Sequence, residues 1–261
     1  MSTQFLIYCE RLDPGMWAEP ANLVSNVGFL VAGIWALARC RRLGIGFRGW
    51  DLWGAALLIV VIGIGSALWH SLHTSWAKEF DVVPILLFIH LYIYSFLRRQ
   101  VLLTITVSVI VVTLFFAASR LFAASTSPHL LHGSIFYLPA MLALGTLAVW
   151  SFTAGAATWR LMALATLLFT ASLLFRTIDG EVCTWLPTGT HFIWHLLNAL
   201  VLSMLFRVLS TARGSDTKNP SRSRRAGVYF DSKPLPPGTM ASTTPSSRAG
   251  ESHRTSLPGP G

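Results

Sequence analysis

Long apolar runs separated by short polar segments dominate the first 210 residues of the chain. A run of roughly 20 apolar residues is long enough to cross the hydrocarbon core of a bilayer as a helix. Seven such runs are present, at 20–40, 51–73, 80–97, 101–118, 132–151, 158–176 and 188–209. The third and fourth are short and only three residues apart, which predicts a tight helical hairpin. The pattern therefore predicts an all-α fold, a bundle of seven transmembrane helices.

The two ends of the chain differ in composition from this apolar region. Residues 1–19 are mixed and polar, without the basic start and short apolar core of a cleavable signal peptide. Residues 211–261 consist mainly of Ser, Pro, Gly, Thr and Arg and have little apolar surface to bury, which predicts a disordered tail. We therefore expect an extracytoplasmic segment at 1–19, a membrane domain at 20–210 and a basic tail at 211–261.

The overall composition supports a membrane protein and excludes an ordinary soluble domain. Hydrophobic residues make up 53% of the chain and charged residues 12%, with a net charge of +9 and a mean hydropathy of +0.56. The tail holds eight Lys or Arg against three acids. Basic residues beside a last membrane helix are expected from topology alone. We therefore infer no nucleic-acid partner, and expect the tail to meet anionic lipid headgroups if it has a partner.

Charged residues predict the orientation of the helices. One set of connections carries most of the arginines (Arg39, Arg41, Arg42, Arg48, Arg98, Arg99, Arg160 and Arg207), which places it and the C-terminus in the cytoplasm. Seven spans then leave the N-terminus outside. Of the eight acids in residues 1–210, only Asp51 falls on the cytoplasmic side; the others are Glu10, Asp13, Glu19, Glu79, Asp81, Asp179 and Glu181. The polar chemistry is thus expected on the outer side.

Histidines at helical spacing point to a metal site on that side. His191 and His195 lie at i and i+4 at the start of the last run, so they share one helix face. Ser66 and His70 have the same spacing at the end of the second run, and Asp81 opens the third run ahead of Pro84, a residue suited to a first helical turn. Three histidines and a water are the ligands of a catalytic zinc with an open position. Ser66 and Asp81 would orient the ligands or act on that water.

Hydrogen-bonded packing is the alternative for any single histidine near a membrane surface. His90, His129 and His132 are interpreted in this way, and His73 is a substitute ligand that lies nearer the loop. Ionisable residues inside a membrane segment are nonetheless functional candidates by default.

The motifs, taken in order, resemble the alkaline ceramidase family, part of a wider group of seven-helix membrane hydrolases that includes the progestin and adipoQ receptors. Ser66-x3-His70, Asp81-x2-Pro84 and His191-x3-His195 carry the likeness, together with Cys9-Glu10 and the segment 18–26. It covers about residues 6–209. The resemblance implies zinc held by His70, His191 and His195, with Asp81 as the general base on the water and Ser66 holding the developing oxyanion.

The same resemblance implies two further features. Similar proteins bind calcium through an acidic N-terminal loop, and Glu10 and Glu19 match that loop, with Asp13 as a compensating ligand. Ile7 and Leu12 depart from the family pattern, and the loop is shorter, so an ordinary solvated segment stays the alternative. A disulfide between Cys9 and Cys183 is also implied, with two free thiols as the alternative. Asp179 and Glu181 would line the pocket mouth or lie on the surface.

We therefore predict a zinc-dependent hydrolase of the membrane that cleaves a ceramide-like lipid amide into a fatty acid and a sphingoid amine. The second hypothesis is a seven-helix lipid-binding receptor or sensor with a structural zinc. A transporter with a proton relay is a third, disfavoured because the sequence shows no inverted repeat and the polar groups lie at one interface. The acyl chain, the headgroup, the source membrane and the oligomeric state do not follow from the sequence.

Overall fold

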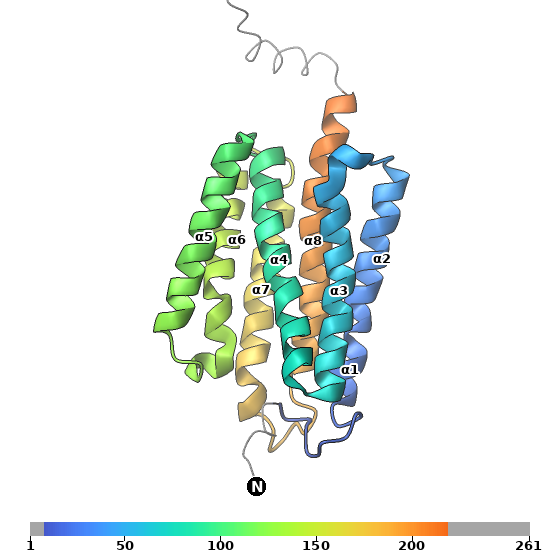
Figure 1. The fold of residues 1–261 in the computed structure, drawn as a ribbon, viewed down its shortest axis with the longest axis vertical. Helices are drawn as coiled ribbons and strands as arrows, with labels where there is room; N and C mark the ends of the chain where they lie inside the picture. Colours follow the sequence, from blue (N-terminus) through green and yellow to red (C-terminus); the bar gives the residue numbers. More distant parts are fainter. Residues whose placement is uncertain (1–7, 219–261) are drawn as a thin grey trace, which may run out of the picture. The chain divides into compact units, whose positions relative to one another are not determined.

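The computed structural model describes residues 8–218, and every regular element in that range is helical. The α-helices are α1 (Pro20–Ser25), α2 (Val27–Arg42), α3 (Trp50–Leu72), α4 (Ser75–Arg99), α5 (Ile105–Ser125), α6 (Leu138–Thr153), α7 (Trp159–Ile178) and α8 (His191–Lys218). The 3-10 helices are η2 (Phe47–Gly49), η3 (Leu130–Tyr137) and η4 (Asp179–Glu181). Seven helical stretches are long and apolar enough to cross a membrane, and they stand side by side (Figure 1). The predicted seven-helix, all-α fold is confirmed.

The core of the bundle lies around α8, which packs against α2, α3, α4 and α7. Large side chains such as Phe29, Ile59, Phe96 and Phe206 fill this space and are almost fully buried. Half of the apolar windows of α3 and α8 is buried, but only 6% of that of α5. Because α5 packs mainly on α4 and leaves its apolar surface uncovered, it is a lipid-facing helix at the edge of the bundle (Figure 1).

The prediction that Asp81 and Pro84 stand in the first turn of a short third span is wrong. Helix α4 begins at Ser75 and runs for 25 residues, with Pro84 inside it. Proline has no N–H, so the carbonyl of Phe80 lacks its usual partner four residues on. That carbonyl lies against Gly65 of α3, where a Cβ atom would be 2.7 Å from the Phe80 carbonyl carbon. A glycine thus lets the two backbones touch, and this contact holds the start of α4 against the end of α3.

The other predicted spans are right in number and shifted at their ends. Helix α5 occupies Ile105–Ser125, later than the predicted 101–118. The prediction that the third and fourth spans are short is wrong, but α4 and α5 do form a hairpin with a short connection. The fifth span begins with η3, whose residues Leu131, His132 and Gly133 have positive φ values, and becomes α-helical only at α6. Helix α8 continues to Lys218. Most of the predicted tail, 211–261, lies outside the described residues.

Candidate metal centre

Three histidines from two helices come together at one end of the bundle. His70 lies in the last turn of α3, and His191 and His195 lie in the first two turns of α8. One nitrogen from each ring lies within 4.8 Å of the others, and all three side chains are buried. Among the described residues, this is the one group of His, Cys, Asp or Glu side chains that could hold a metal ion.

Hydrogen bonds from neighbouring elements orient two of the rings. The Nδ1 atom of His70 is 2.5 Å from a carboxylate oxygen of Glu19, and the Nδ1 atom of His195 is 2.7 Å from the hydroxyl of Ser25. Both rings thus keep Nε2 for a ligand. Histidines that bind metals almost always use their second nitrogen in this way, because the outer partner fixes the tautomer and the ring plane. Ser66 lies 3.4 Å from the Nε2 atom of His195.

The third ring has no such partner. The Nδ1 atom of His191 is buried and makes no hydrogen bond within the described part of the chain. The ring instead contacts two aromatic rings: it stacks on Trp194 at a centroid distance of 5.1 Å and meets Tyr8 in a tilted contact at 4.2 Å. A buried ring nitrogen left without a partner is costly unless another group meets it. The cluster therefore fits a cation among its three imidazoles.

Asp81 lies beside this cluster. It is positioned by the close backbone contact between α3 and α4 at Gly65 and Phe80. It faces the hydroxyl of Ser66 and interacts electrostatically with His70 and Arg176. One carboxylate oxygen, Oδ1, is buried and has no hydrogen-bond partner among the described residues. Arg176 of α7 lies over the rings of Tyr137 and Trp194, 5.5 and 5.3 Å from their centroids. The site thus holds one carboxylate with an unused oxygen and one nearby cation.

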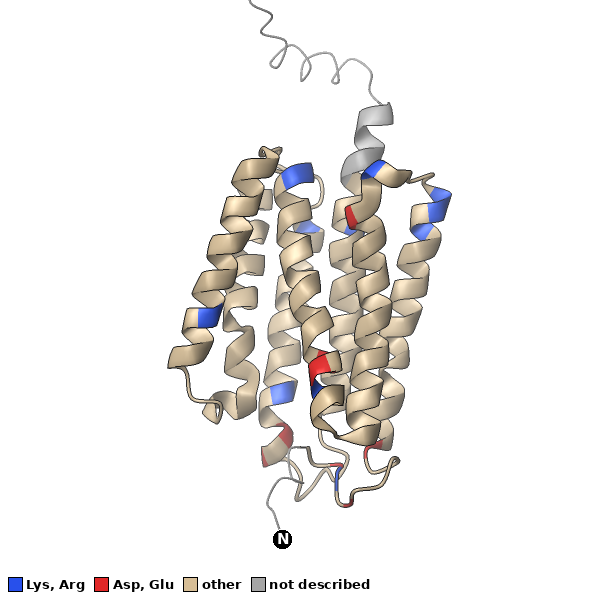
Figure 2. Cartoon of the chain, in the orientation of Figure 1, with Lys and Arg blue, Asp and Glu red and all other residues tan. Residues whose placement is uncertain are grey.

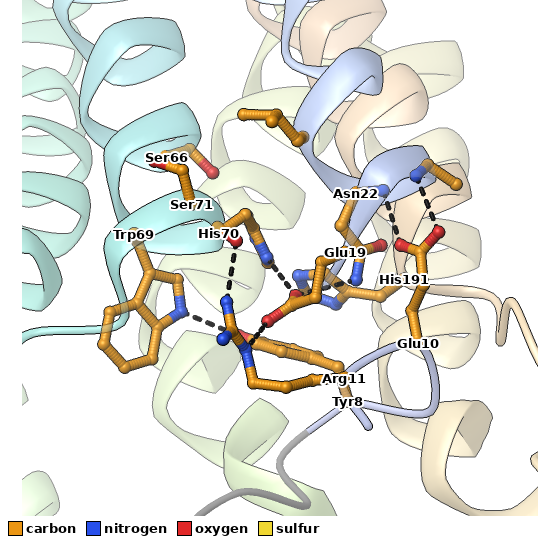
Figure 3. A network of polar contacts seen from close by, with 12 residues as sticks. Tyr8, Glu10, Arg11, Glu19, Asn22, Ser66, Trp69, His70, Ser71 and His191 are labelled. Carbon is orange, nitrogen blue, oxygen red and sulfur yellow. Dashed lines mark hydrogen bonds and ion pairs between the residues drawn. The ribbon is translucent and has the colours of Figure 1, made fainter. Parts of the chain in front are cut away.

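The N-terminal segment covers the cluster from outside the helices (Figure 3). Tyr8 packs on both His70 and His191, at centroid distances of 5.0 and 4.2 Å, and its hydroxyl accepts from Trp69. Burial raises the pKa of the Tyr8 hydroxyl above its ordinary value. A disulfide joins Cys9 to Cys183, so the cover is tied to the connection that precedes α8.

Asp179 stabilises the same connection through hydrogen bonds to its backbone. Its Oδ1 atom accepts from the backbone N–H groups of Thr190 and His191, at 2.6 and 2.8 Å, and its Oδ2 atom accepts from that of Cys9 at 3.2 Å. A carboxylate at a helix N-terminus satisfies free N–H groups and is stabilised by the helix dipole. Asp179 therefore sets where α8 begins and so places His191. Glu181, the other acid of this connection, is exposed beside His132.

The three carboxylates expected to bind calcium do not gather into a cation site in the described residues. Glu10 accepts from the N–H groups of Ala21 and Asn22, at 2.6 and 2.9 Å, and so caps α1. Asp13 is exposed and accepts from the N–H of Gly15. Both oxygens of Glu19 are already engaged. The structure therefore offers no support for calcium, which stays a prediction from resemblance.

The model of the family described as Ceramidase matches residues 8–236 of this chain. The chain belongs to the ceramidase family. The resemblance carried by the short histidine motifs is therefore confirmed, and membership implies a membrane hydrolase that acts on a lipid amide. Among the curated proteins, none matches the chain.

An apolar cavity lies inside the helix bundle. Its walls come from α2, α3, α4, α6, α7 and α8, and its few polar groups include Tyr92, Tyr137 and Asn198. Trp194 forms part of the wall and stacks on His191, so the wall of the cavity adjoins the histidine cluster. Such a chamber suits a hydrocarbon chain.

Three residues of the site were not assigned a role from the sequence: Arg11, Ser25 and Arg176. Asp179, expected at the pocket mouth or on the surface, is buried and caps α8. Ser25 lies in the segment that carries the family likeness, and Arg11 is a lone basic residue among N-terminal acids. These signals mark them as unusual but do not name their partners. Glu19 was predicted to bind calcium, and its carboxylate instead makes a hydrogen bond with the ring of His70.

Proposed function

We propose that the chain is a zinc-dependent amide hydrolase that cleaves a ceramide-like lipid into a fatty acid and a sphingoid amine. The observation that carries this proposal is the set of three buried imidazole nitrogens within 4.8 Å of one another. Neutral imidazoles suit zinc, and three of them with an open fourth position are typical of catalytic zinc sites. A bound zinc ion would supply a Lewis acid and lower the pKa of water to roughly 7.

Asp81 is the proposed general base. It takes a proton from the attacking water as the oxygen adds to the amide carbonyl carbon, and the carbonyl oxygen becomes an oxyanion. When the C–N bond breaks, Asp81 returns the proton to the leaving nitrogen, so that a fatty acid and an amine result. The unpartnered buried oxygen of Asp81 supports this role, because it is free to accept the proton.

Ser66 and the cavity are proposed to position the substrate. The Ser66 hydroxyl, one turn before His70 on α3, would donate to the oxyanion; one such donor is worth about 3 kcal/mol of the barrier in other hydrolases. An acyl chain that enters from the lipid would lie in the apolar cavity, with its carbonyl beside Trp194. The cavity walls exclude water from the chain and hold the amide near Asp81.

Metal analysis of the detergent-purified protein tests the proposal. We expect one zinc per chain, lost in His195→Ala and retained in His90→Ala, a matched substitution in the middle of α4 whose ring bonds to the carbonyl of Leu86. Release of fatty acid from a panel of lipid amides and esters, read by mass spectrometry, then defines the substrate. A parent protein without stoichiometric zinc would refute the zinc mechanism.

Asp81→Asn separates the enzyme from a lipid receptor with a structural zinc. The amide keeps the shape of the carboxyl group but cannot take the proton. For the enzyme we expect zinc content to stay and kcat to fall about 100-fold or more, in line with the loss of a general base. A receptor would retain bound lipid without turnover in both proteins.

We also propose that the metal centre faces the extracytoplasmic side. The arginines in the last turns of α2 and α4 lie at one end of the bundle (Figure 2): Arg39, Arg41, Arg42, Arg98 and Arg99. The last turn of α3, which carries His70, lies at the opposite end (Figure 1). Positive residues favour the cytoplasmic side. Labelling of single cysteines placed at Arg48 and at Lys78 with a membrane-impermeant reagent would give the orientation, with only Lys78→Cys labelled in intact cells.

A further inference from the structure

A buried arginine lies directly behind the metal centre. The side chain of Arg11 is only 1% exposed, although it comes from the segment before α1. Its Nε atom donates to one carboxylate oxygen of Glu19, and its Nη2 atom donates to the backbone carbonyl of His70 at 2.8 Å (Figure 3). Its Nη1 atom is 3.4 Å from the carbonyl of Asp13. The guanidinium thus binds one carboxylate and two main-chain carbonyls.

The positive charge of Arg11 acts through Glu19 on a metal-binding histidine. Glu19 is fully buried, and its second oxygen meets the Nδ1 atom of His70 and the side-chain amide of Asn22. The Glu19 carboxylate thus has hydrogen-bond partners on both oxygens and no exposed surface. Arg11, Glu19 and His70 therefore form a continuous chain from cation to carboxylate to imidazole.

The ligands of Arg11 are those that a hard cation takes. Calcium prefers carboxylate and main-chain carbonyl oxygens, and it needs six to eight of them. Here the guanidinium occupies the centre of such a group, with Glu19 and the carbonyls of Asp13 and His70 around it. The carboxylates of the other two acids accept backbone N–H groups elsewhere, Glu10 from α1 and Asp13 from Gly15. A calcium ion cannot share these oxygens with a positive side chain.

We propose that Arg11 is a built-in cation that takes the place of calcium in this chain. It holds Glu19 in position and through it orients His70, so Arg11 and Glu19 are positioning residues, and the oxygens around Arg11 need no calcium ion. Lysine would be a poor substitute, because its three N–H groups leave from one compact nitrogen atom, whereas the planar guanidinium spreads its donors over three nitrogens. The zinc part of this inference rests on the proposed function; the calcium part does not.

The first experiment needs no variant. Full-length protein in detergent, exchanged into calcium-free buffer, is heated without and with 1 mM CaCl2, with zinc content measured in each case. We expect the same midpoint of thermal unfolding and the same zinc content in both. A midpoint several degrees higher with calcium would overturn the proposal. Because unfolding is followed whether or not zinc is present, a protein without zinc would refute the proposed function and still decide this inference.

Substitutions then test the positioning role. Arg11→Ala should weaken zinc binding about 10- to 100-fold, the usual effect of losing an outer partner of a metal ligand. Arg11→Lys should give a smaller loss, and Lys78→Ala, an exposed cation in the first turn of α4, should give none. If Arg11→Ala does not fold, Arg11→Lys and Glu19→Gln carry the test. Zinc affinity unchanged in the folded variants would overturn the role of Arg11.

Discussion

An arginine–carboxylate pair lies at each end of α3, and the two pairs differ in their contacts. At the start of α3, Asp51 receives two bonds from Arg99 of α4, at 2.6 and 2.5 Å. At the far end, about 28 Å away along the helix, Glu19 binds Arg11 and also His70. The side chains of Asp51 and Arg99 are 7% and 17% exposed, while those of Glu19 and Arg11 are 0% and 1% exposed.

This difference separates a structural link from a functional one. Both oxygens of Asp51 accept from the single guanidinium of Arg99, so the pair links α3 to α4. Glu19 divides its oxygens between a cation and an imidazole, so any change in the pair is passed to a proposed zinc ligand. An ion pair in a membrane helix bundle therefore has to be judged by what its carboxylate touches besides the arginine.

The largest effect is expected from Gly65 of α3, with Gly54 of the same helix as the matched comparison. In Gly65→Ala the new Cβ would meet the backbone of Phe80, which cannot move aside without shifting α4 and Asp81. We expect activity to fall at least about 100-fold, as when catalytic groups are displaced by about 1 Å. In Gly54→Ala, near the Asp51 end, the Cβ meets only a methyl group of Leu91 at 3.2 Å. Hydrolysis and thermal unfolding of both variants should differ sharply; equal activities would contradict the role of the backbone contact.

Neutralising the two carboxylates compares the pairs directly. Glu19→Gln leaves a buried arginine unpaired and weakens the hold on His70, so we expect zinc affinity to fall about 10- to 100-fold and stability to drop by about 3 to 5 kcal/mol. Asp51→Asn should lower stability less, because Arg99 is partly exposed, and should leave zinc affinity unchanged. Zinc titration and denaturation measure both. Parallel losses of zinc in the two variants would remove the distinction.

The disulfide at the site end has no counterpart at the other end, where Cys40 is a free buried thiol. Cys9→Ser with Cys183→Ser should lower stability by about 2 to 5 kcal/mol. It should also loosen Tyr8 over the histidines. Unfolding with and without a reducing agent measures the effect, and Cys40→Ser is the matched control. A reductant that destabilises the double variant as much as the parent would contradict this assignment.

The smallest effect is expected from the cap of α8. Asp179→Ala removes the acceptor of three N–H groups, so we expect a loss of about 1 to 2 kcal/mol of stability and a several-fold lower kcat through His191. Glu181→Ala, two residues on and exposed, should change neither. Chemical denaturation and initial rates of hydrolysis provide the measurements. A loss confined to stability would show that Asp179 does not help to position His191.

The sequence alone determined the membrane fold and the zinc-ligand candidates. Runs of apolar residues are a local signal that burial in lipid requires, so seven helices could be counted without knowing their packing. The spacing of His191 and His195 places both on one helix face for the same local reason. The cysteines of the disulfide were likewise named from the resemblance.

Only the tertiary structure decided which polar groups meet. The carbonyl of Phe80 has no helical N–H partner, because Pro84 lies four residues on, and it contacts Gly65, because α3 passes close by. The pattern of apolar residues along the chain does not indicate this contact. From the sequence, Glu19 and Arg11 could belong to a calcium-binding segment or to a solvated one. In the fold both are buried, with Arg11 bonded to Glu19 and Glu19 bonded to His70. Partners that lie far apart in the chain are set by the packing of helices, since a buried charge is stable only where the fold brings it a partner.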